Sequence, residues 1–301
     1  MNSDAVNLNV TIAGIQMQNP MMNASGCFAI EAASRISGLD PSCYGAMLSK
    51  GTTLELRSGN HQPRICEHPE GGMVNSIGLE NLGIDHTLKV IVPKMAKYGV
   101  PVILNISGFT IEEFKVMAAK ANQVVDVTAL EVNISCPNVH GGKIPFGCDP
   151  QIAAEVTKAV RSVTDLPVIV KLTPNVSEKL IGEIAQAVEQ AGADAISLIN
   201  TVKVENIGGI PVGGWSGPPI KPIAMRMISL VRQAVKIPII GMGGVTTVED
   251  VVDFIKLGCS GVAVGTASFA NPLIIMELID GLKKYCLEHG ISDISQLNGK
   301  K

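Results

Sequence analysis

The chain has 301 residues, of which 46% are hydrophobic and 17% charged, and its formal net charge is −3. This composition excludes global disorder, and the lack of a basic surplus together with only 3% aromatic residues argues against a nucleic-acid partner. The first residues show no basic segment followed by an apolar run, and no apolar stretch reaches the roughly 18 residues that span a bilayer. We therefore expect a soluble, cytoplasmic protein with neither a membrane nor a nucleic-acid partner.

Eight short apolar runs, rich in residues that favour β-strands, are spaced along the chain. They lie at 19–25, 45–49, 100–106, 129–135, 166–172, 194–200, 237–242 and 261–265. Between them, apolar residues at helical spacing predict helices within 110–124, 175–194 and 245–261. Thr110 and Glu113 form a candidate capping box for the first helix, and Gly192 and Gly258 are candidate C-terminal caps for the other two.

Near-continuous apolar strands that alternate with helices indicate a parallel sheet covered by helices. Eight such units in about 250 residues fit a (β/α)8 TIM barrel of the α/β class, and residues 1–301 are predicted to form a single domain. An open doubly wound sheet is the alternative, disfavoured because no G-x-G-x-x-G motif follows the first strand. Residues 7–19 alternate in polarity and predict an N-terminal β-hairpin over the bottom of the barrel. The segments 51–86 and 201–222 exceed simple connections and are expected to be long active-site loops.

The seven cysteines predict neither a disulfide framework nor a metal site. Their number is odd and the chain is long, whereas disulfide scaffolds are typically short secreted chains with paired cysteines. No C-x-x-C pair occurs, and the five histidines lack the spacing of metal ligands. Cys136, which lies at the end of a predicted strand, is considered separately below. The other six cysteines are expected to be packing residues, and among them Cys148 is also a candidate for an additional reactive thiol.

Polar residues follow the predicted strands at the ends where a (β/α)8 barrel places its active site. The strand ends carry Ala24-Ser25-Gly26, Ser49-Lys50-Gly51, Asn105, Asn133, Cys136, Lys171, Asn200 and Thr201. Burying unpaired polar groups costs roughly a few kcal/mol each, so two lysines and three asparagines converging on one mouth indicate a binding site rather than core packing.

The last two strands end in glycine, in "GMGG" (241–244) and "VGTASF" (264–269). Loops after strands seven and eight of a barrel frequently bind phosphate through backbone N–H groups, and glycine lets the backbone approach the anion. A phosphate-tailed flavin fits this mouth, because its ring needs several hydrogen bonds and a lysine near N1 and O2 would stabilise the anionic reduced ring.

Together these motifs resemble a known family. "NISCPNV", "SKGTT", "GGMVNSIGLENLGID", "VIVKLTPN", "LINT", "GMGGV" and "AVGTASF" resemble class 1 dihydroorotate dehydrogenase over essentially the whole chain, and the wording is closest to the class 1B, NAD-linked catalytic subunit. The resemblance implies that FMN is held by Ala24, Ser25, Lys50, Gly51, Asn105, Asn133, Lys171, Ile199, Gly217, Gly243, Gly244, Gly265 and Thr266. It implies that dihydroorotate is held by Lys50, Asn75, Ser76, Ile77, Gly78, Leu79, Asn133, Asn138, Asn200 and Thr201.

The resemblance also assigns the chemistry and the partner. Cys136 would be the base that removes the C5 proton while hydride leaves C6 for the flavin; a thiol with an ordinary pKa near 8.5 needs only a modest shift for this role. A second subunit carrying FAD and a 2Fe–2S iron–sulfur cluster would pass the electrons to NAD⁺. The assembly would be a heterotetramer of two copies of each chain, built on a homodimer of this one.

Three alternatives remain open. A class 1A homodimer would use fumarate directly, without a partner. A dihydropyrimidine dehydrogenase subunit shares the flavin barrel and the cysteine, but has histidine after the Cys-Pro pair where this chain has Asn138. A barrel that binds phosphate without flavin, as a binding protein or isomerase, belongs to another class and would purify colourless.

Overall fold

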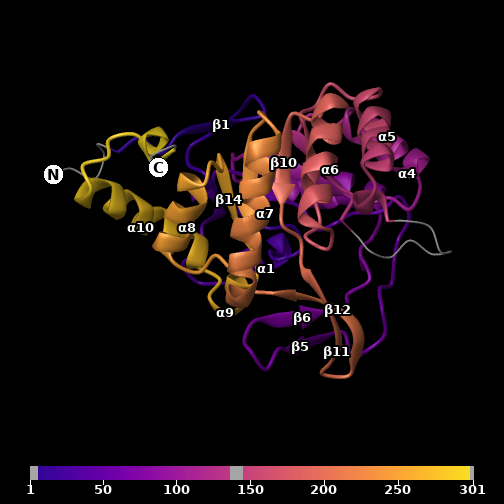
Figure 1. The fold of residues 1–301 in the computed structure, drawn as a ribbon, viewed down its shortest axis with the longest axis horizontal. Coiled ribbons are helices and arrows are strands. Elements are labelled where there is room, and N and C mark those ends of the chain that lie inside the picture. The colour runs from indigo at the N-terminus through magenta and orange to yellow at the C-terminus, as the bar shows by residue number, and fades with distance from the viewer. Residues whose placement is uncertain (1–5, 136–144, 299–301) are drawn as a thin grey trace.

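The computed structural model describes residues 6–135 and 145–298, and its centre is a sheet of eight parallel strands (Figure 1). In spatial order the strands are β3 (Met21–Asn23), β14 (Gly261–Val264), β13 (Ile239–Met242), β10 (Ala195–Leu198), β9 (Val168–Lys171), β8 (Ala129–Asn133), β7 (Val102–Ile106) and β4 (Met47–Leu48). Each lies within a predicted range. The predicted (β/α)8 barrel is therefore confirmed, and the open doubly wound alternative is wrong.

A polar side chain helps to close the barrel between its first two strands. A parallel bridge joins Met22 to Ala46, and β4 is too short to extend it. The buried Asn23 side chain supplies the missing contacts: its Nδ2 donates to the Leu48 carbonyl at 2.8 Å, and its Oδ1 accepts from the Leu48 amide at 3.0 Å. The amide thus replaces a pair of backbone hydrogen bonds across the seam.

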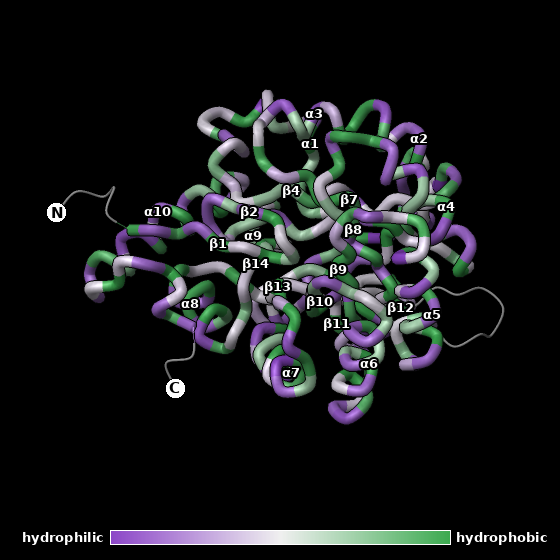
Figure 2. Tube along the Cα trace, turned by 90° about the horizontal axis from the view of Figure 1, so that it is seen from above, coloured by the Kyte–Doolittle hydropathy of each residue, from purple (hydrophilic) through white to green (hydrophobic). Residues whose placement is uncertain are grey.

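Helices cover the outside of the barrel, as the view from above shows (Figure 2). They are α1 (Ile30–Ala33), α2 (Ile84–His86), α3 (Val92–Ala96), α4 (Ile111–Ala121), α5 (Pro150–Arg161), α6 (Glu178–Gln190), α7 (Lys221–Ala234), α8 (Val248–Lys256), α9 (Ala267–Ala270) and α10 (Ile274–Glu288). A π-helical turn, Thr87–Ile91, joins α2 to α3, and 3₁₀ turns lie at Pro41–Cys43, Phe146–Cys148, Pro218–Ile220 and Ile294–Leu297. No helix in the described ranges has the length and apolarity needed to cross a membrane.

The helix caps agree with the sequence except in one detail. Thr110 Oγ1 accepts from the Glu113 amide at 3.1 Å, but the Glu113 carboxylate accepts from the Phe109 amide at 2.6 Å rather than from Thr110. The predicted capping box of α4 is therefore only half formed, because its carboxylate binds one residue earlier. The predicted ends of α6 and α8 are confirmed: Gly192 and Gly258 follow them with φ of +99° and +102°, the left-handed conformation that glycine adopts without strain.

The predicted hairpin is confirmed and plugs the bottom of the barrel. Strands β1 (Val10–Ile12) and β2 (Ile15–Met17) pair antiparallel, and both residues of the turn, Ala13 and Gly14, have positive φ, as a two-residue hairpin turn requires. Their buried side chains join one apolar cluster with an inward residue from each of several barrel strands: Ile12, Ile15, Met17, Ile103, Ala129, Ile169, Ala195 and Ile240. Each buried isoleucine or methionine of this cluster contributes about 1.5–3 kcal/mol.

The two long segments pair into one small sheet at the end of the barrel where the carboxyl ends of its strands lie. Its order is β11 (Val202–Ile207), β12 (Ile210–Ser216), β6 (Met73–Asn75) and β5 (Ile65–Glu67), all antiparallel. Figure 1 shows this sheet standing away from the barrel, below it in that view. The prediction of two separate loops missed these strands. Glycines in β12 obscure its pattern, and its partner β6 lies far away in the sequence.

Candidate active site

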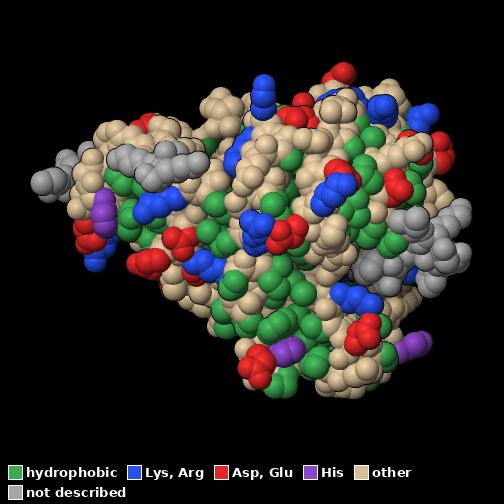
Figure 3. All heavy atoms as spheres, in the orientation of Figure 1, with side chains coloured by type: hydrophobic (Ala, Val, Ile, Leu, Met, Phe, Trp, Pro, Cys, Tyr) green, Lys and Arg blue, Asp and Glu red, His purple; other side chains and the backbone are tan. Residues whose placement is uncertain are grey.

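A cleft of about 770 Å³ lies between the carboxyl ends of the barrel strands and the small sheet. This size is typical of a small-molecule site. Figure 3 shows apolar side chains gathered on this face, over the region where Figure 1 draws α9 and the small sheet. Phe269, Ile65 and Val212 line the cleft and are 55%, 53% and 47% exposed, respectively, so its rim is apolar.

The structure brings nearly all described residues of the predicted site together in this one cleft. Its lining includes Ala24, Ser25, Lys50, Gly51, Asn75, Ser76, Ile77, Gly78, Leu79, Asn133, Lys171, Ile199, Asn200, Thr201, Gly217, Gly243, Gly244, Gly265 and Thr266. Asn105 is the exception, because it is fully buried beneath the lining. Cys136 and Asn138 lie outside the described residues.

The floor of the cleft is a buried polar network that includes two residues absent from the sequence-based prediction, Glu131 and Ser197. Glu131 is fully buried in β8. Its Oε1 accepts from Ser197 Oγ at 2.7 Å, and its Oε2 accepts from Asn105 Nδ2 at 2.5 Å. Lys171 Nζ lies 3.8 Å from the same Oε2. A carboxylate within the apolar run "ALEVNIS" is the sequence signal that could have revealed this network.

Two atoms of this floor lack a partner among the described residues. Asn105 Oδ1 is buried and accepts no hydrogen bond. The Lys171 side chain is only 5% exposed, and its ammonium lies near Glu131 at a distance too long for a hydrogen bond. Buried polar groups are nearly always paired, so the floor is suited to a ligand that offers an acceptor to Lys171 and a donor to Asn105.

Glycines form one wall of the cleft. Gly243 and Gly244 have φ of +120° and +81°, and a Cβ on Gly244 would come within 2.7 Å of Lys221 Cβ. The amides of Gly244, Gly265 and Thr266 donate to no backbone carbonyl among the described residues. These N–H groups are available to an anion, which fits the predicted phosphate loops.

An ionic clamp behind this wall holds the loop after β13. Asp250 Oδ2 accepts from the Thr246 and Thr247 amides, each at 2.8 Å, and from Thr246 Oγ1 at 2.9 Å. Its Oδ1 accepts from Lys221 Nζ at 2.5 Å. Burial opposes the charge, but hydrogen bonds from Lys221 and the two threonines hold the pKa of Asp250 below its ordinary value. The sequence reasoning missed this clamp.

The opposite side of the cleft presents a cation and a strained loop. Desolvation by the walls lowers the pKa of Lys50; Glu80 opposes this effect and Arg64 adds to it. Gly78 and Leu79 both have positive φ, +73° and +57°. A leucine in this conformation is uncommon and is typical of backbones fixed for binding.

The side-chain amides of two asparagines beside the floor are held by serine hydroxyl groups. Asn133 Nδ2 donates to Ser107 Oγ at 3.1 Å, and its Oδ1 accepts from both the amide and the hydroxyl of Ser135. Asn200 Nδ2 donates to Ser135 Oγ at 2.8 Å. These contacts fix the orientation of two predicted ligand-binding amides before any ligand arrives.

Burial disfavours the thiolate form of two cysteines, Cys27 and Cys148. Burial raises the pKa of Cys27, which lines the cleft, to about 11, with Lys171 acting weakly in the other direction. Burial also raises the pKa of Cys148, which argues against its expected reactivity because the thiolate is the reactive form.

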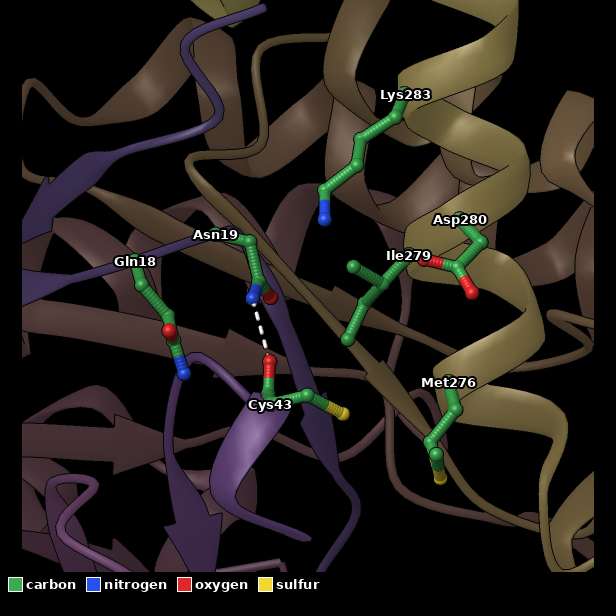
Figure 4. A pocket seen from close by; sticks show the side chains of 7 residues that line it. All are labelled: Gln18, Asn19, Cys43, Met276, Ile279, Asp280 and Lys283. Carbon is green, nitrogen blue, oxygen red and sulfur yellow. Dashed lines mark hydrogen bonds between the residues drawn. The ribbon is translucent and has the colours of Figure 1, made fainter. Parts of the chain in front are cut away.

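A second, smaller cavity of about 160 Å³ lies at the other end of the barrel, between the segment before β3 and helix α10 (Figure 4). Its amides already serve the fold: Asn19 Nδ2 donates to the Cys43 carbonyl at 2.7 Å, and Gln18 Nε2 donates to the Ser42 and Tyr44 carbonyls. We assign no function to this cavity.

The eight-stranded parallel barrel and the polar cleft at its carboxyl ends define a (β/α)8-barrel enzyme. The dihydroorotate dehydrogenase family model matches residues 7–286. A dihydroorotate dehydrogenase B (NAD(+)), catalytic subunit, of Desulforamulus reducens is 48% identical, covering 98% of this chain and 98% of that protein. Proteins of the same name from Anoxybacillus flavithermus and Alkaliphilus metalliredigens are each 46% identical, covering 97% and 98% of this chain and 95% and 98% of theirs. The chain therefore belongs to the dihydroorotate dehydrogenase family, which confirms the resemblance seen in its motifs.

Proposed function

We propose that this chain oxidises dihydroorotate to orotate, a step of pyrimidine biosynthesis, with FMN bound in the cleft and with NAD⁺ as the final acceptor through a partner subunit. The observation that carries the proposal is the unsatisfied pair on the floor, Lys171 and Asn105, facing a cleft whose other wall is glycine. Family membership then selects the substrate.

The residues present fit FMN. The pyrimidine edge of an isoalloxazine ring carries N1 and O2 as acceptors and N3–H as a donor, and these complement Lys171 and Asn105 Oδ1. The free amides at Gly244, Gly265 and Thr266 suit the phosphate, and the remaining predicted FMN ligands line the same cleft. When bound, FMN supplies the hydride acceptor.

The substrate site is proposed on the side of Lys50 and residues 75–79. Lys50 would neutralise the substrate carboxylate, and the amides of Asn133 and Asn200 would bind the ring, since hydroxyl partners already orient them. Cys136 would accept the C5 proton, and Asn138 would bind the substrate beside it. These two roles follow from the motif "NISCPNV".

The partner is proposed from the relatives, which are named catalytic subunits of an NAD(+) enzyme. We propose an electron-transfer subunit with FAD and a 2Fe–2S cluster, in a heterotetramer containing a homodimer of this chain. Among the described residues no group of three or more His, Cys, Asp or Glu side chains could hold a metal ion.

The test is a set of turnover assays on the purified chain. The protein should be yellow, and dihydroorotate, but not dihydrouracil, should bleach it. NAD⁺ reduction should appear only after the partner subunit is added. Lys171→Ala should slow bleaching strongly, while Lys179→Ala, whose side chain is 86% exposed on α6, should not. Colourless protein, preference for dihydrouracil, or brisk fumarate turnover without gain from the partner would each contradict the proposal.

A further inference from the structure

Glu131 is a fully buried carboxylate that the proposed reaction does not use. It lies in the middle of β8 at 0% exposure. Its partners are Asn105 and Lys171 of the two adjacent strands, β7 and β9, and Ser197 of β10, the next strand beyond β9. Burying such a charge is costly even when it is paired, and a well-packed apolar residue is often as stable. A role in the site above it accounts for a carboxylate at this position better than packing does.

The first consequence concerns the orientation of Asn105. Both Glu131 oxygens act as acceptors, one for Ser197 and one for Asn105 Nδ2. An ionised carboxylate offers no donor, so Asn105 cannot turn its own oxygen toward it. Asn105 Oδ1 is thereby left as the unpaired buried acceptor, available only to a donor from a ligand.

The second consequence concerns Lys171. Its Nζ lies 3.8 Å from Glu131 Oε2, close enough for strong attraction at low local dielectric but too far for a hydrogen bond. The carboxylate therefore draws the ammonium toward the floor without occupying its N–H groups. It also offsets part of the positive charge that the cleft would otherwise receive.

We propose that Glu131 is a positioning residue for the flavin: it presents Asn105 Oδ1 to N3–H, leaves the Lys171 donors for the N1 and O2 edge, and limits how far Lys171 raises the reduction potential. This inference rests on the proposed function, since it requires FMN in the cleft. Glu131 would touch neither FMN nor substrate, and it would act on the ring through both Asn105 and Lys171.

Glu131→Gln separates these effects from a purely structural role. With its oxygen toward Ser197, the glutamine opposes its NH₂ to Asn105 Nδ2 and favours turning Asn105 over. With its oxygen toward Asn105, its NH₂ must be accepted by Ser197 Oγ, so Asn105 is held less firmly than by the carboxylate. We expect the FMN dissociation constant to rise by up to about tenfold, the scale of one lost hydrogen bond in a buried site. The flavin carries N3–H in both redox states, so losing its contact with Asn105 leaves the midpoint potential of FMN unchanged. Removing the negative charge beside Lys171 instead shifts the potential to more positive values, because it favours the anionic reduced ring.

Three further variants complete the test, with FMN affinity measured by titration of stripped protein and potentials measured by dye equilibration. Asn105→Ala should weaken FMN binding similarly without a positive potential shift, and adding Glu131→Gln to it should cause little further loss of affinity. Thr157→Ala, which removes a buried hydrogen bond to the Ala153 carbonyl on α5, controls for destabilisation and should change neither quantity.

The outcomes are distinguishable. If the unaltered protein binds no FMN, the proposed function itself fails. If it binds FMN, an unchanged potential in Glu131→Gln or additive losses in the double variant would overturn the role of Glu131 alone. Wild-type FMN affinity in Asn105→Ala would also overturn it, even if Glu131→Gln did not fold.

Discussion

Replacing Asp250 by asparagine is expected to destabilise the protein and to weaken FMN binding. The Asp250 carboxylate accepts three hydrogen bonds from Thr246 and Thr247 and one from Lys221. Asparagine keeps one acceptor oxygen, so it can serve the threonines or the lysine but not both. If its oxygen faces the threonines, its NH₂ group opposes the Lys221 ammonium.

The size of the effect follows from burial. The Asp250 and Lys221 side chains are 12% and 24% exposed, so solvent screens their pairing only in part. One lost hydrogen bond between charged groups costs about 1.5–3 kcal/mol, and the opposed donors add to it, so we expect Asp250→Asn to lower the free energy of unfolding by about 2–4 kcal/mol. Asp253 contacts the same lysine but is 48% exposed, and Asp253→Asn should cost only about 0–1 kcal/mol.

Urea denaturation of the two variants beside the unaltered protein measures this difference, and FMN titration should show a larger loss for Asp250→Asn. The pKa of Asp250 is lowered in the fold, so its contribution is fully present above the ordinary aspartate value and disappears as the pH falls through the lowered one. The gap between variants should therefore stay constant from about pH 8 to 5 and narrow only below about pH 4. Equal small losses for both variants at neutral pH would refute the reasoning.

Three other predictions concern Gly244, Lys50 and Cys136. Gly244→Ala should abolish FMN binding, because its Cβ would meet Lys221 at 2.7 Å. The control Gly290→Ala is also at positive φ but has nothing within 4 Å, so it should lower stability by about 1 kcal/mol and leave FMN affinity unchanged. Equal FMN affinity in the two variants would contradict this prediction. Orotate affinity should fall with rising pH earlier than an ordinary lysine allows, because the pKa of Lys50 is lowered, and Lys50→Arg should remove this dependence in a binding titration between about pH 8 and 10. Cys136→Ser should retain FMN and orotate but lose about 10²-fold or more in turnover at pH 7, with a residual rate that rises with pH; a loss within about threefold would exclude Cys136 as the base.

Most of the barrel could be predicted because its signals are local. Each strand lies in a mostly apolar run, and the glycines at 192 and 258 end two helices where the sequence indicates. The small sheet could not be predicted in the same way. Gly213 and Gly214 lie in β12 because Val74 and Thr201 pack against them, and glycine weakens any strand pattern. Only the folded chain brings β12 beside β6, so the sequence showed two long loops where the structure has one sheet.

Most of the predicted site residues lie at or just after the end of a strand, whereas Glu131 and Ser197 lie within strands and were missed. Lys171 and Asn133 end their strands and were found, whereas Glu131, two residues before Asn133, was absorbed into an apolar run. Asp250 and Lys221 lie on helices beside the cleft. Their role became visible only through the contact that joins α7 and α8 to the glycine loop.

Strand periodicity explains why the floor has its composition. Side chains two positions apart point to the same face of a strand, and Ile103, Ala129, Ile169 and Ala195 belong to the apolar cluster inside the barrel. Two residues further along the same strands are Asn105, Glu131, Lys171 and Ser197, which form the charged floor. Two residues further still, Ser107 and Asn133 are hydrogen-bonded at 3.1 Å. The interior therefore changes over three layers from apolar to charged to amide and hydroxyl, and the charged layer lies between the apolar cluster and the cleft. This places Glu131 where it can orient the groups proposed to bind the flavin ring while remaining out of contact with water.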